Sequence, residues 1–427
     1  MKEKSRAEPQ LTRRLGLLAT TLIGIGVILG AGIYVLVGVA AKQAGNAVWL
    51  SLLMAAVVAG FTGLSYARLS KLRPKNAPEF QYLNMAFGKA PAFLAGWLVL
   101  WSTIISAAVV ALGFAGYLEH LFGVPNFFGA TGLILLSSTI VFLGIGESSI
   151  FATLLTLVEV SGILIIIFIG IPSIGDVNLL EMPKGFSGVV GAASLVFFAY
   201  LGFEGMANMS EEMKNPERDL PKALLLALFS STILYILVAI SAVSVLGWLD
   251  LSSSSAPLAA VAAQVLGQKA DLLLSGIALA STANTVLLLL FAASRSMWAM
   301  ACAGVFPMRL CVIGEHHHTP WLTILLVGAC SSVFVLFKNI ENVAEFTNFA
   351  VLLAFIGVNA SVIKLFAKDN TTGNIKHIFL NRIMPVLGCL TALWLAVTLG
   401  WQAAIFGLIL LSVGIVAYYL MKRYIKV

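Results

Sequence analysis

Four glycines stand close together in the first long apolar run of the sequence, in the stretch GIGVILGAGIY from Gly24 to Tyr34. The spacing of Gly24, Gly26 and Gly30 is similar to that of a turn that holds the phosphates of a dinucleotide. Such a turn needs a preceding strand, a following helix and an acidic residue about 20 positions later. Here both flanks are apolar, and the next acidic residue is Glu79. The pattern therefore does not favour nucleotide binding.

These glycines could serve either of two structural purposes. Small residues let neighbouring membrane helices approach closely. Alternatively, the helix is broken here, since each glycine destabilises a helix interior by roughly 1 kcal/mol relative to alanine. The remaining residues that could do chemistry are polar side chains inside apolar sequence, namely Glu159, Glu204, Ser281, Thr282 and Asn284. Their roles depend on the elements that position them.

The composition is that of a membrane protein. Of the 427 residues, 60% are hydrophobic and 11% are charged, and the mean hydropathy is +0.99. A chain that crosses the bilayer many times needs this much apolar sequence, whereas a soluble domain does not. The four cysteines, at positions 302, 311, 330 and 389, have no paired spacing, so we expect neither a disulfide framework nor a zinc site. The net charge of +7 is spread over short loops, which indicates membrane orientation and not nucleic acid binding.

Apolar runs separated by polar segments predict twelve membrane-spanning helices. Their approximate limits are 15–41, 46–68, 90–118, 126–145, 149–171, 189–211, 222–248, 270–301, 320–337, 344–366, 379–399 and 401–421. An even number places both termini on one side. If that side is the inner one, it holds 22 of the 26 lysines and arginines, and the outer side holds Lys42, Lys184, Lys269 and Lys338. This asymmetry follows the positive-inside rule, so we predict that both termini are cytoplasmic.

Two of the predicted spans contain an interruption. The first, from Leu15 to Ala41, would be about 40 Å long as a straight helix, whereas the hydrocarbon core is about 30 Å thick. The sixth contains Gly202, Glu204 and Gly205 within SLVFFAYLGFEGMANMSEE. Interruptions at corresponding places of two halves indicate a transporter built from inverted repeats. We therefore divide the chain into a tail (1–14), two repeats of five helices (15–171 and 189–366), a C-terminal helix pair (379–421) and a second tail (422–427).

An unwound membrane helix exposes backbone groups that must line a polar cavity or bind a solute. The N–H groups at the start of a half-helix attract an anion, and the freed carbonyls attract a cation. A zwitterion needs both. We therefore interpret Gly30, Ala31 and Gly32 as bare backbone that binds a substrate carboxylate, with close helix packing as the alternative.

The sequence resembles the amino acid–polyamine–organocation transporters over nearly its whole length. The resemblance is carried by GVILGAGIY (26–34), by FFAYLGFEGMANMSEEMKNPERDLPKAL (197–224) and by ALASTANTVLLLLFAASRSMWAMACAGVFP (278–307). It implies an all-α fold of five plus five helices in inverted repeats, in which helices 1 and 6 are broken, with two further C-terminal helices. It also implies alternating access around a central site.

The resemblance also implies the residues of that site. The substrate carboxylate would meet the N–H groups of Ala31 and Gly32, and the amino group would meet the carbonyls of Ile28, Phe198 and Leu201. The ring of Phe198 would lie over the substrate. The predicted substrate site consists of Ile28, Gly30, Ala31, Gly32, Phe198, Ala199, Leu201, Gly202 and Asn284. The segment RPKNAPEFQYLNMAFG after the second span lacks the glycine pair that is usual before the tyrosine, so the family pattern does not define the intracellular gate here.

Four residues are candidates for ion coupling. Glu159 lies deep in the fifth span, where a charge costs about 2.5–3.5 kcal/mol or more, at a place where some proton-coupled relatives carry a lysine. It either carries the coupling proton or hydrogen-bonds a neighbouring helix without titrating. Glu204 is expected first to accept hydrogen bonds from unwound backbone, with proton coupling as the second role. Ser281 and Thr282 could ligate sodium or could bond to their own helix, and Asn284 could line the site or only pack.

The sequence does not indicate an enzyme. His316 to His318 stand side by side without spaced partners, which is typical of a solvated loop, and no nucleophile–histidine–acid set is present. We expect no cofactor and no metal. The sequence predicts a secondary active transporter of small or neutral amino acids in the cell membrane, coupled to protons, with sodium as a second candidate. An uncoupled exchanger of amino acids or amines and a membrane sensor of amino acids that does not transport are the alternatives.

Overall fold

The chain is built almost entirely of helices. The computed structural model describes residues 13–254, 256–314, 316–336, 340–367 and 378–424. The predicted tails, 1–14 and 422–427, lie largely outside these residues. No strand occurs in the described part, whose extended pairing is limited to one parallel bridge between Leu15 and Met213. The prediction of an all-α fold is confirmed.

Long apolar helices correspond to the predicted spans. In chain order they are α1 (Leu17–Ala44), α2 (Val48–Leu72), α4 (Lys89–Phe122), α5 (Asn126–Leu143), α6 (Ile145–Gly170), α7 (Gly185–Val196) with η3 (Phe197–Tyr200) and η4 (Glu204–Glu212), α8 (Pro216–Ser253), α10 (Gln268–Cys302), α11 (Trp321–Phe334), α12 (Ile340–Leu365), η6 (Phe379–Ile383) with α14 (Met384–Thr398), and α15 (Trp401–Tyr424). Among the described residues, 11 stretches are long and apolar enough to cross a membrane. The ninth predicted span is shorter, since α11 has only 14 residues. The chain is a multi-pass membrane protein.

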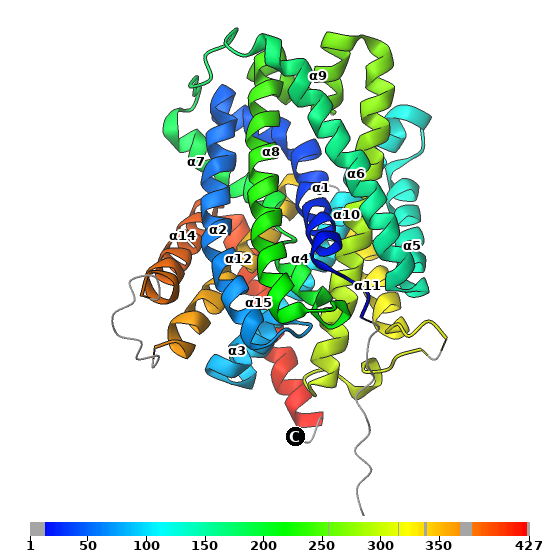
Figure 1. The fold of residues 1–427 in the computed structure, drawn as a ribbon, viewed down its shortest axis with the longest axis vertical. Helices are drawn as coiled ribbons and strands as arrows, with labels where there is room; N and C mark the ends of the chain where they lie inside the picture. The colour runs from blue at the N-terminus through cyan, green and yellow to red at the C-terminus, as the bar shows by residue number, and fades with distance from the viewer. Residues whose placement is uncertain (1–12, 255, 315, 337–339, 368–377, 425–427) are drawn as a thin grey trace, which may run out of the picture.

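Two short helices lie outside the predicted spans and mark the two ends of the bundle. They are α3 (Pro78–Phe87) and α9 (Pro257–Leu266), and each begins with a proline, which suits the first turn because its missing N–H has no helical partner. Figure 1 shows α3 at one end and α9 at the other. We call the end with α3 the lower end and the end with α9 the upper end. Three one-turn helices complete the described chain: η1 (Gly45–Ala47), η2 (Ile171–Ser173) and η5 (Met308–Leu310).

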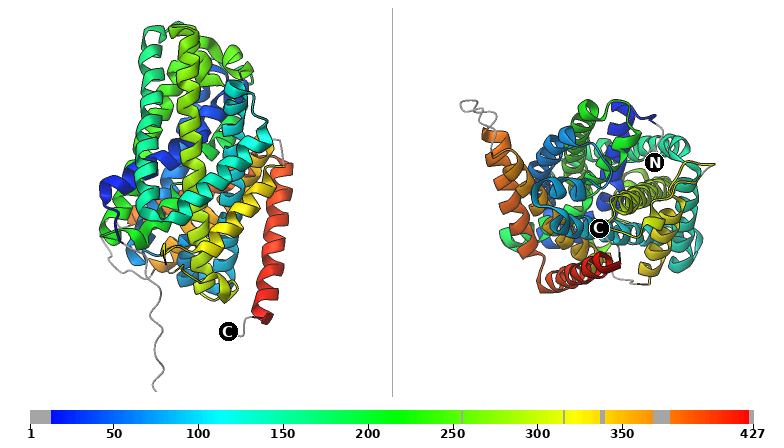
Figure 2. Two further views of the ribbon diagram at one scale, coloured as in Figure 1. Left: turned by 90° about the vertical axis from the view of Figure 1, so that its right-hand side faces the viewer. Right: turned by 90° about the horizontal axis from the view of Figure 1, so that it is seen from below.

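The first helix occupies the centre of the bundle. It packs against α6, α7, α8 and α10. The last helix, α15, runs along the outside, as Figure 2 shows. Outer helices expose large apolar side chains such as Phe229, Val397 and Trp401, which suits contact with lipid because the bilayer core has no water to bind polar groups. The fold therefore places α1, and any break in it, where several helices can reach it.

Candidate functional site

The first helix departs from helical geometry at one residue. Gly30 has φ −17° and ψ −148° inside the otherwise helical α1. The glycines around it also allow close packing, since a Cβ at Gly30 would overlap the side chain of Thr285, and a Cβ at Gly32 would overlap Ala199. The glycine-rich stretch therefore serves both purposes, with a break at Gly30 and close helix contact on either side of it.

The sixth span, Gly185–Glu212, has a longer break. Its helix α7 tightens into η3, the chain is then extended at Leu201, and Gly202 has φ +111°, a region that side-chain-bearing residues rarely adopt. A Cβ at Gly202 would overlap the side chain of Val27 in α1. The two breaks are thus in direct contact at the centre of the bundle.

Side chains satisfy the backbone groups that the breaks leave free. The hydroxyl of Tyr235, in α8, lies within hydrogen-bond reach of the carbonyls of Ile28 and Ala199, the latter at 2.8 Å. The carboxylate of Glu204 accepts a hydrogen bond from the Gly202 N–H at 2.9 Å. The amide of Asn348, in α12, donates to the Ser194 carbonyl at 2.8 Å. Each of these bonds replaces one that a continuous helix would make.

Tyr235 and Asn348 were not among the predicted site residues. Each is a polar side chain in an apolar run, in STILYILV and in FTNFAVLL. A buried hydroxyl or amide needs a hydrogen-bond partner, and in a membrane helix that partner is often on another helix. This signal could have identified both residues as partners of a broken helix, although it does not say which one.

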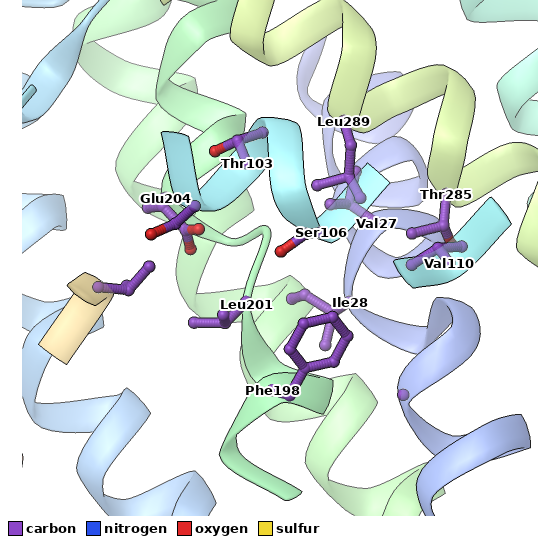
Figure 3. Close-up of a pocket in the computed structure, with 13 residues that line it drawn as sticks. Val27, Ile28, Thr103, Ser106, Val110, Phe198, Leu201, Glu204, Thr285 and Leu289 are labelled. Atoms are coloured by element: carbon purple, nitrogen blue, oxygen red, sulfur yellow. The ribbon is translucent and has the colours of Figure 1, made fainter. Parts of the chain in front are cut away.

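A pocket lies between the two breaks and the neighbouring helices α4, α10 and α12 (Figure 3). Most of its lining is apolar, with a few hydroxyls and one carboxyl, and it contains no lysine, arginine or histidine among the described residues. The lining residues are Val27, Ile28, Gly32, Ser102, Thr103, Ser106, Val110, Phe198, Leu201, Glu204, Thr285, Leu289 and Val351. Ser102 is 1% exposed, and its hydroxyl has no hydrogen-bond partner in the described chain. We call this space the central pocket.

The predicted substrate residues fall into three groups. Those that line the central pocket are Ile28, Gly32, Phe198 and Leu201. Those that lie in the backbone of the breaks beside it are Gly30, Ala31, Ala199 and Gly202. Asn284 lies apart from the lining, and its amide donates to the Thr156 hydroxyl at 3.1 Å.

The contribution of α4 was missed. One face of this helix brings Ser102, Thr103, Ser106 and Val110 to the pocket. The corresponding stretch, WSTIISAAVV, contains no charge and no glycine. Nothing in it distinguishes a lining serine from a hydroxyl that only bonds to its own helix, as the Thr103 hydroxyl does to the Val99 carbonyl at 2.8 Å.

A second polar cluster surrounds Glu159 between α1, α6 and α10. The fully buried carboxyl accepts a hydrogen bond from the Ser281 hydroxyl through Oε1, whereas Oε2 has no hydrogen-bond partner in the described chain. The Tyr34 hydroxyl donates to the Glu159 backbone carbonyl at 3.1 Å. Thr282 does not join the cluster, because its hydroxyl donates to the Ala278 carbonyl of its own helix at 2.7 Å. Ser281 and Glu159 are thus brought together, and Thr282 is directed elsewhere.

The cluster and the central pocket are connected. The hydroxyl of Thr285, which lines the pocket, donates to the backbone carbonyl of Ser281 at 3.1 Å. Ser281 in turn donates to Glu159. Ser281 thus contacts Thr285 through its backbone carbonyl and Glu159 through its hydroxyl.

A buried ion pair joins the end of the sixth span to α10. Arg295 Nε lies 3.5 Å from Glu212 Oε1, and each side chain is 1% exposed. The Arg295 guanidinium also lies 3.8 Å from the centroid of the Phe291 ring. Next to this pair, the backbone carbonyl of Glu212 accepts from the Leu15 N–H at 3.0 Å, and the Lys214 N–H donates to the Leu15 carbonyl at 2.8 Å. The start of α1 and the end of the sixth span are thereby joined.

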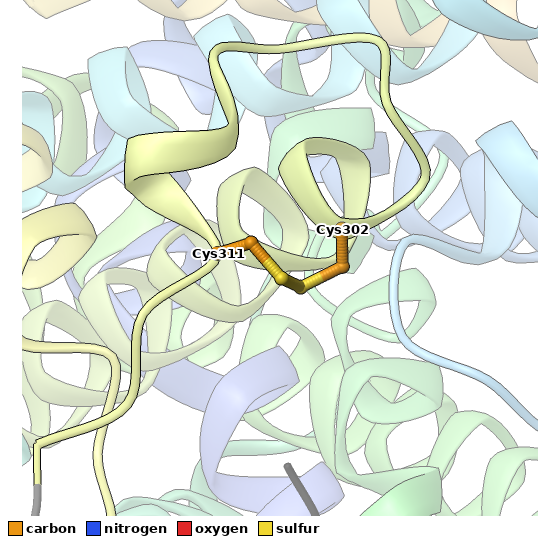
Figure 4. The surroundings of a disulfide bond; sticks show 2 residues. All are labelled: Cys302 and Cys311. Atoms are coloured by element: carbon orange, nitrogen blue, oxygen red, sulfur yellow. A yellow bond between two sulfur atoms is a disulfide. The ribbon is translucent and has the colours of Figure 1, made fainter. Parts of the chain in front are cut away.

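A cavity of about 1330 Å³ opens at the lower end and has a basic lining. We call it the lower cavity. Its charged residues are Arg13, Arg73, Lys75, Lys89, Glu211, Lys214, Glu217 and Arg218. Cys302 and Cys311 also line it and form a disulfide, with their Cα atoms 4.9 Å apart (Figure 4). The expectation of no disulfide is therefore wrong for this pair, because the turn after α10 folds back onto the helix end and brings together cysteines nine residues apart.

Comparison with known proteins identifies relatives of the chain. The amino acid permease family matches residues 15–426 of the chain. The chain is 29% identical to the branched-chain amino acid permease BcaP of Bacillus subtilis (strain 168), over 97% of the chain and 94% of that relative. It is 29% identical to a methylthioribose transporter of the same organism, over the same shares.

A further relative is a human protein. The chain is 32% identical to the cationic amino acid transporter 4 of Homo sapiens, over 85% of the chain and 61% of that relative. The match over nearly the whole chain agrees with the multi-pass helical fold. The chain belongs to the amino acid permease family of the amino acid–polyamine–organocation superfamily.

Proposed function

We propose that the protein is a secondary active transporter of small or neutral amino acids that works by alternating access. The observation that carries this proposal is the central pocket, which two broken membrane helices and their backbone enclose. In this proposal the N–H groups of Ala31 and Gly32 bind the substrate carboxylate. A half-helix start is suited to that task by its unpaired donors and by its dipole.

The pocket lining supports a neutral substrate. The side chains of Val110, Leu289 and Val351 offer apolar contact, and the one carboxyl, Glu204, is already engaged by the Gly202 N–H. A cationic side chain would have to be desolvated here against that single carboxylate, and an anionic one would meet no cation among the described lining residues. The name of the relative BcaP, a branched-chain amino acid permease, agrees with an aliphatic substrate.

The proposed orientation places the lower end in the cytoplasm of the cell, with both termini there. It is supported by the excess of lysine and arginine on that side of the predicted topology. The proposed halves of the transporter are the repeats 15–171 and 189–366, whose first helices carry the two breaks. In this orientation the buried pair Arg295–Glu212 closes the cytoplasmic exit, and it must separate when the site opens inward.

Proton coupling is assigned to Glu159. Its carboxyl is buried, has one oxygen without a partner in the described chain, and is connected to the pocket wall through Ser281 and Thr285. A carboxyl with different proton affinity in the outward-open and closed states couples proton movement to the transport cycle by linkage. Because a charge inside the membrane is costly, ionisable residues are rare in membrane helices, and those that occur usually have a function.

The test uses the full-length chain in liposomes. Wild-type protein should concentrate L-leucine when a pH gradient is imposed in the absence of sodium. Glu159→Gln should abolish this accumulation but retain exchange of internal for external leucine, because glutamine keeps the shape and hydrogen-bonding end but cannot release a proton. Glu119→Gln, at an exposed glutamate near the end of α4, is the matched control and should behave as wild type.

Other outcomes separate the alternatives. Exchange without accumulation in the wild type would favour an uncoupled exchanger. Binding without movement of label would favour a sensor. If Glu159→Gln still accumulates leucine under the pH gradient, Glu159 is not the coupling site, and Glu204 becomes the next candidate.

A further inference from the structure

The short helix α3 is fastened to the lower part of the broken sixth span. Its preceding residue, Ala77, has φ 55° and ψ 59°, a left-handed conformation that is uncommon for a residue with a side chain. The Ala77 N–H donates to Asn208 Oδ1 at 2.8 Å, and the Asn76 N–H donates to Glu211 Oε1 at 3.1 Å. The start of α3 therefore moves with η4 or must separate from it. This is the segment in which the sequence departs from the family pattern.

A buried carboxyl stands in the first turn of α3. Glu79 is 2% exposed, and its Oε1 accepts a hydrogen bond from the Tyr66 hydroxyl at 2.6 Å. The Tyr66 ring is surrounded edge-on by the rings of Tyr82, Phe203 and Phe355, at centroid distances of 5.6–5.8 Å. Glu79 forms no salt bridge with any lysine or arginine in the described chain. A charge enclosed in this way is costly unless it is paired.

Glu79 lies between the two cavities. Glu204, with which Glu79 interacts electrostatically, lines the central pocket. The neighbours of Glu79 on α3, namely Phe80, Gln81 and Asn84, line the lower cavity. The Tyr66 hydroxyl donates to Glu79 and interacts electrostatically with Glu204. Glu79 is thus adjacent to lining residues of the lower cavity and interacts with a lining residue of the central pocket.

Glu79 interacts with three titratable groups: Tyr66 from α2, Tyr82 from α3 itself and Glu204 from η4. The elements packed against α3 carry further charged groups, namely Glu211, the Glu212–Arg295 pair, Lys89 at the exposed start of α4, and Lys364 of α12, which lies over the Phe87 ring at the far end of α3. Burial raises the pKa of Glu79 from its ordinary 4.5 to about 7, against the opposing effect of the Tyr66 hydrogen bond. Burial thus favours the protonated form of Glu79.

We propose that Glu79 holds a proton while the lower end is closed and releases it into the lower cavity when α3 separates from η4. The proton leaves the Glu79 carboxylic acid, and water in the lower cavity accepts it. A second negative charge beside Glu204 in this enclosed site is unfavourable, so the closed state favours a neutral Glu79. The inference rests on the proposed function only in that this proton takes part in transport.

The sign of the pH effect follows from linkage. The closed state binds the proton more tightly than an open state in which water reaches Glu79, so rising pH favours opening of the lower end. This effect develops between the ordinary pKa of 4.5 and the raised value of about 7, and it is complete above that value. Replacement by glutamine should remove it, since the group is then neutral at every pH.

The experiment combines two measurements on the full-length chain in liposomes. The first is L-leucine exchange as a function of pH on the lower-end face. The wild-type rate should rise several-fold from about pH 5 to about pH 7 and level off above that, whereas Glu79→Gln should give a flat profile. Glu217→Gln, at an exposed glutamate that lines the same lower cavity, is the control and should keep the wild-type profile.

The second measurement needs no substrate. Infrared difference spectra between about pH 5 and about pH 8 should contain a protonated-carboxyl band that is smaller in Glu79→Gln and unchanged in Glu217→Gln. If Glu79→Gln fails to fold, Tyr66→Phe serves instead, and the band midpoint should move to higher pH because the ionised form loses its hydrogen bond. A wild-type band and pH profile in Glu79→Gln, or an unmoved midpoint in Tyr66→Phe, would overturn the proposal. A titrating Glu79 in a protein that does not accumulate leucine would instead contradict the proposed function alone.

Discussion

The two breaks beside the central pocket are stabilised in different ways. In α1 a single residue, Gly30, leaves the helical geometry, and the freed Ile28 carbonyl is reached by Tyr235 from another helix. In the sixth span the break extends from Phe197 to Gly202, and the Gly202 N–H is bound by Glu204, two residues along the same chain. The first break is thus supported from outside, and the second carries part of its own support.

The supports of the two breaks respond differently when α8 moves relative to α1. The support of the α1 break changes whenever α8 moves relative to α1, because Tyr235 belongs to α8. The Glu204–Gly202 bond is local and can persist through such a movement. Tyr235 also reaches the Ala199 carbonyl, so one hydroxyl connects both breaks to α8. We therefore expect replacement of Gly202, at the local support, to affect folding, and replacement of Tyr235, the external support, to affect substrate affinity.

The largest effect is expected for Gly202→Val. A valine would need a left-handed conformation and would overlap Val27, so it should strain the backbone by about 1–3 kcal/mol and also push α1 aside. Thermal unfolding in detergent should show a large loss of stability or no folded protein. The control is Gly205→Ala, where the new Cβ would meet Ala292 at an ordinary 3.5 Å. A stable Gly202→Val would mean that the second break does not need its glycine.

A smaller effect, on binding, is expected for Tyr235→Phe. The ring remains, but the carbonyls of Ile28 and Ala199 lose their common donor, at a cost of about 1–3 kcal/mol. Leucine affinity should fall roughly tenfold, as measured by competition for uptake. Tyr200 lies in the second break, but its buried hydroxyl donates to the Leu52 carbonyl of α2 and to no carbonyl of either break. Tyr200→Phe should therefore lower stability with little change in affinity. Equal effects of the two variants on affinity would contradict the role of Tyr235.

The smallest effect is expected for Phe198→Ala. Phe198 lines the central pocket at the start of the second break, where its ring supplies apolar area and excludes water. Its loss should weaken leucine retention by roughly fivefold, or about 1 kcal/mol, measured as a faster efflux of bound label. Phe198→Met keeps most of the bulk and should give an intermediate value. Normal transport kinetics in Phe198→Ala would mean that another side chain covers the substrate.

Local signals in the sequence identified the helices and the places where two of them break. Hydropathy located the spans, and the glycines at 30 and 202 mark the residues whose backbone leaves helical geometry at the two breaks. The same signals could not identify Ser102 or Ser106 of α4 as lining residues, because a serine in an apolar helix has the same local sequence whether it faces a pocket or a neighbour.

Local sequence signals also could not predict the disulfide or the burial of Glu79. Cys302 and Cys311 meet because the turn between them folds back, which depends on the packing of that turn against α10. Glu79 stands in a polar segment of the sequence between two spans. In the fold it is buried beside Tyr66 of α2, whose ring packs against rings of the sixth span and α12. Its partner Tyr66 is 13 residues away in sequence.

The sequence by itself determined that this protein crosses a membrane many times, and it predicted interruptions in the first and sixth spans and singled out Glu159 and Glu204 as acidic residues inside apolar sequence. These properties follow from the composition of single segments. Each segment that crosses the bilayer must be apolar over a sufficient length, and its backbone N–H and C=O groups must find hydrogen-bond partners. The tertiary structure decided which side chains meet: Tyr235 with both breaks, Ser281 with Glu159, and Tyr66 with Glu79. Such meetings depend on helix rotation and packing, which arise from all the neighbouring helices together and leave no mark on any one stretch of sequence.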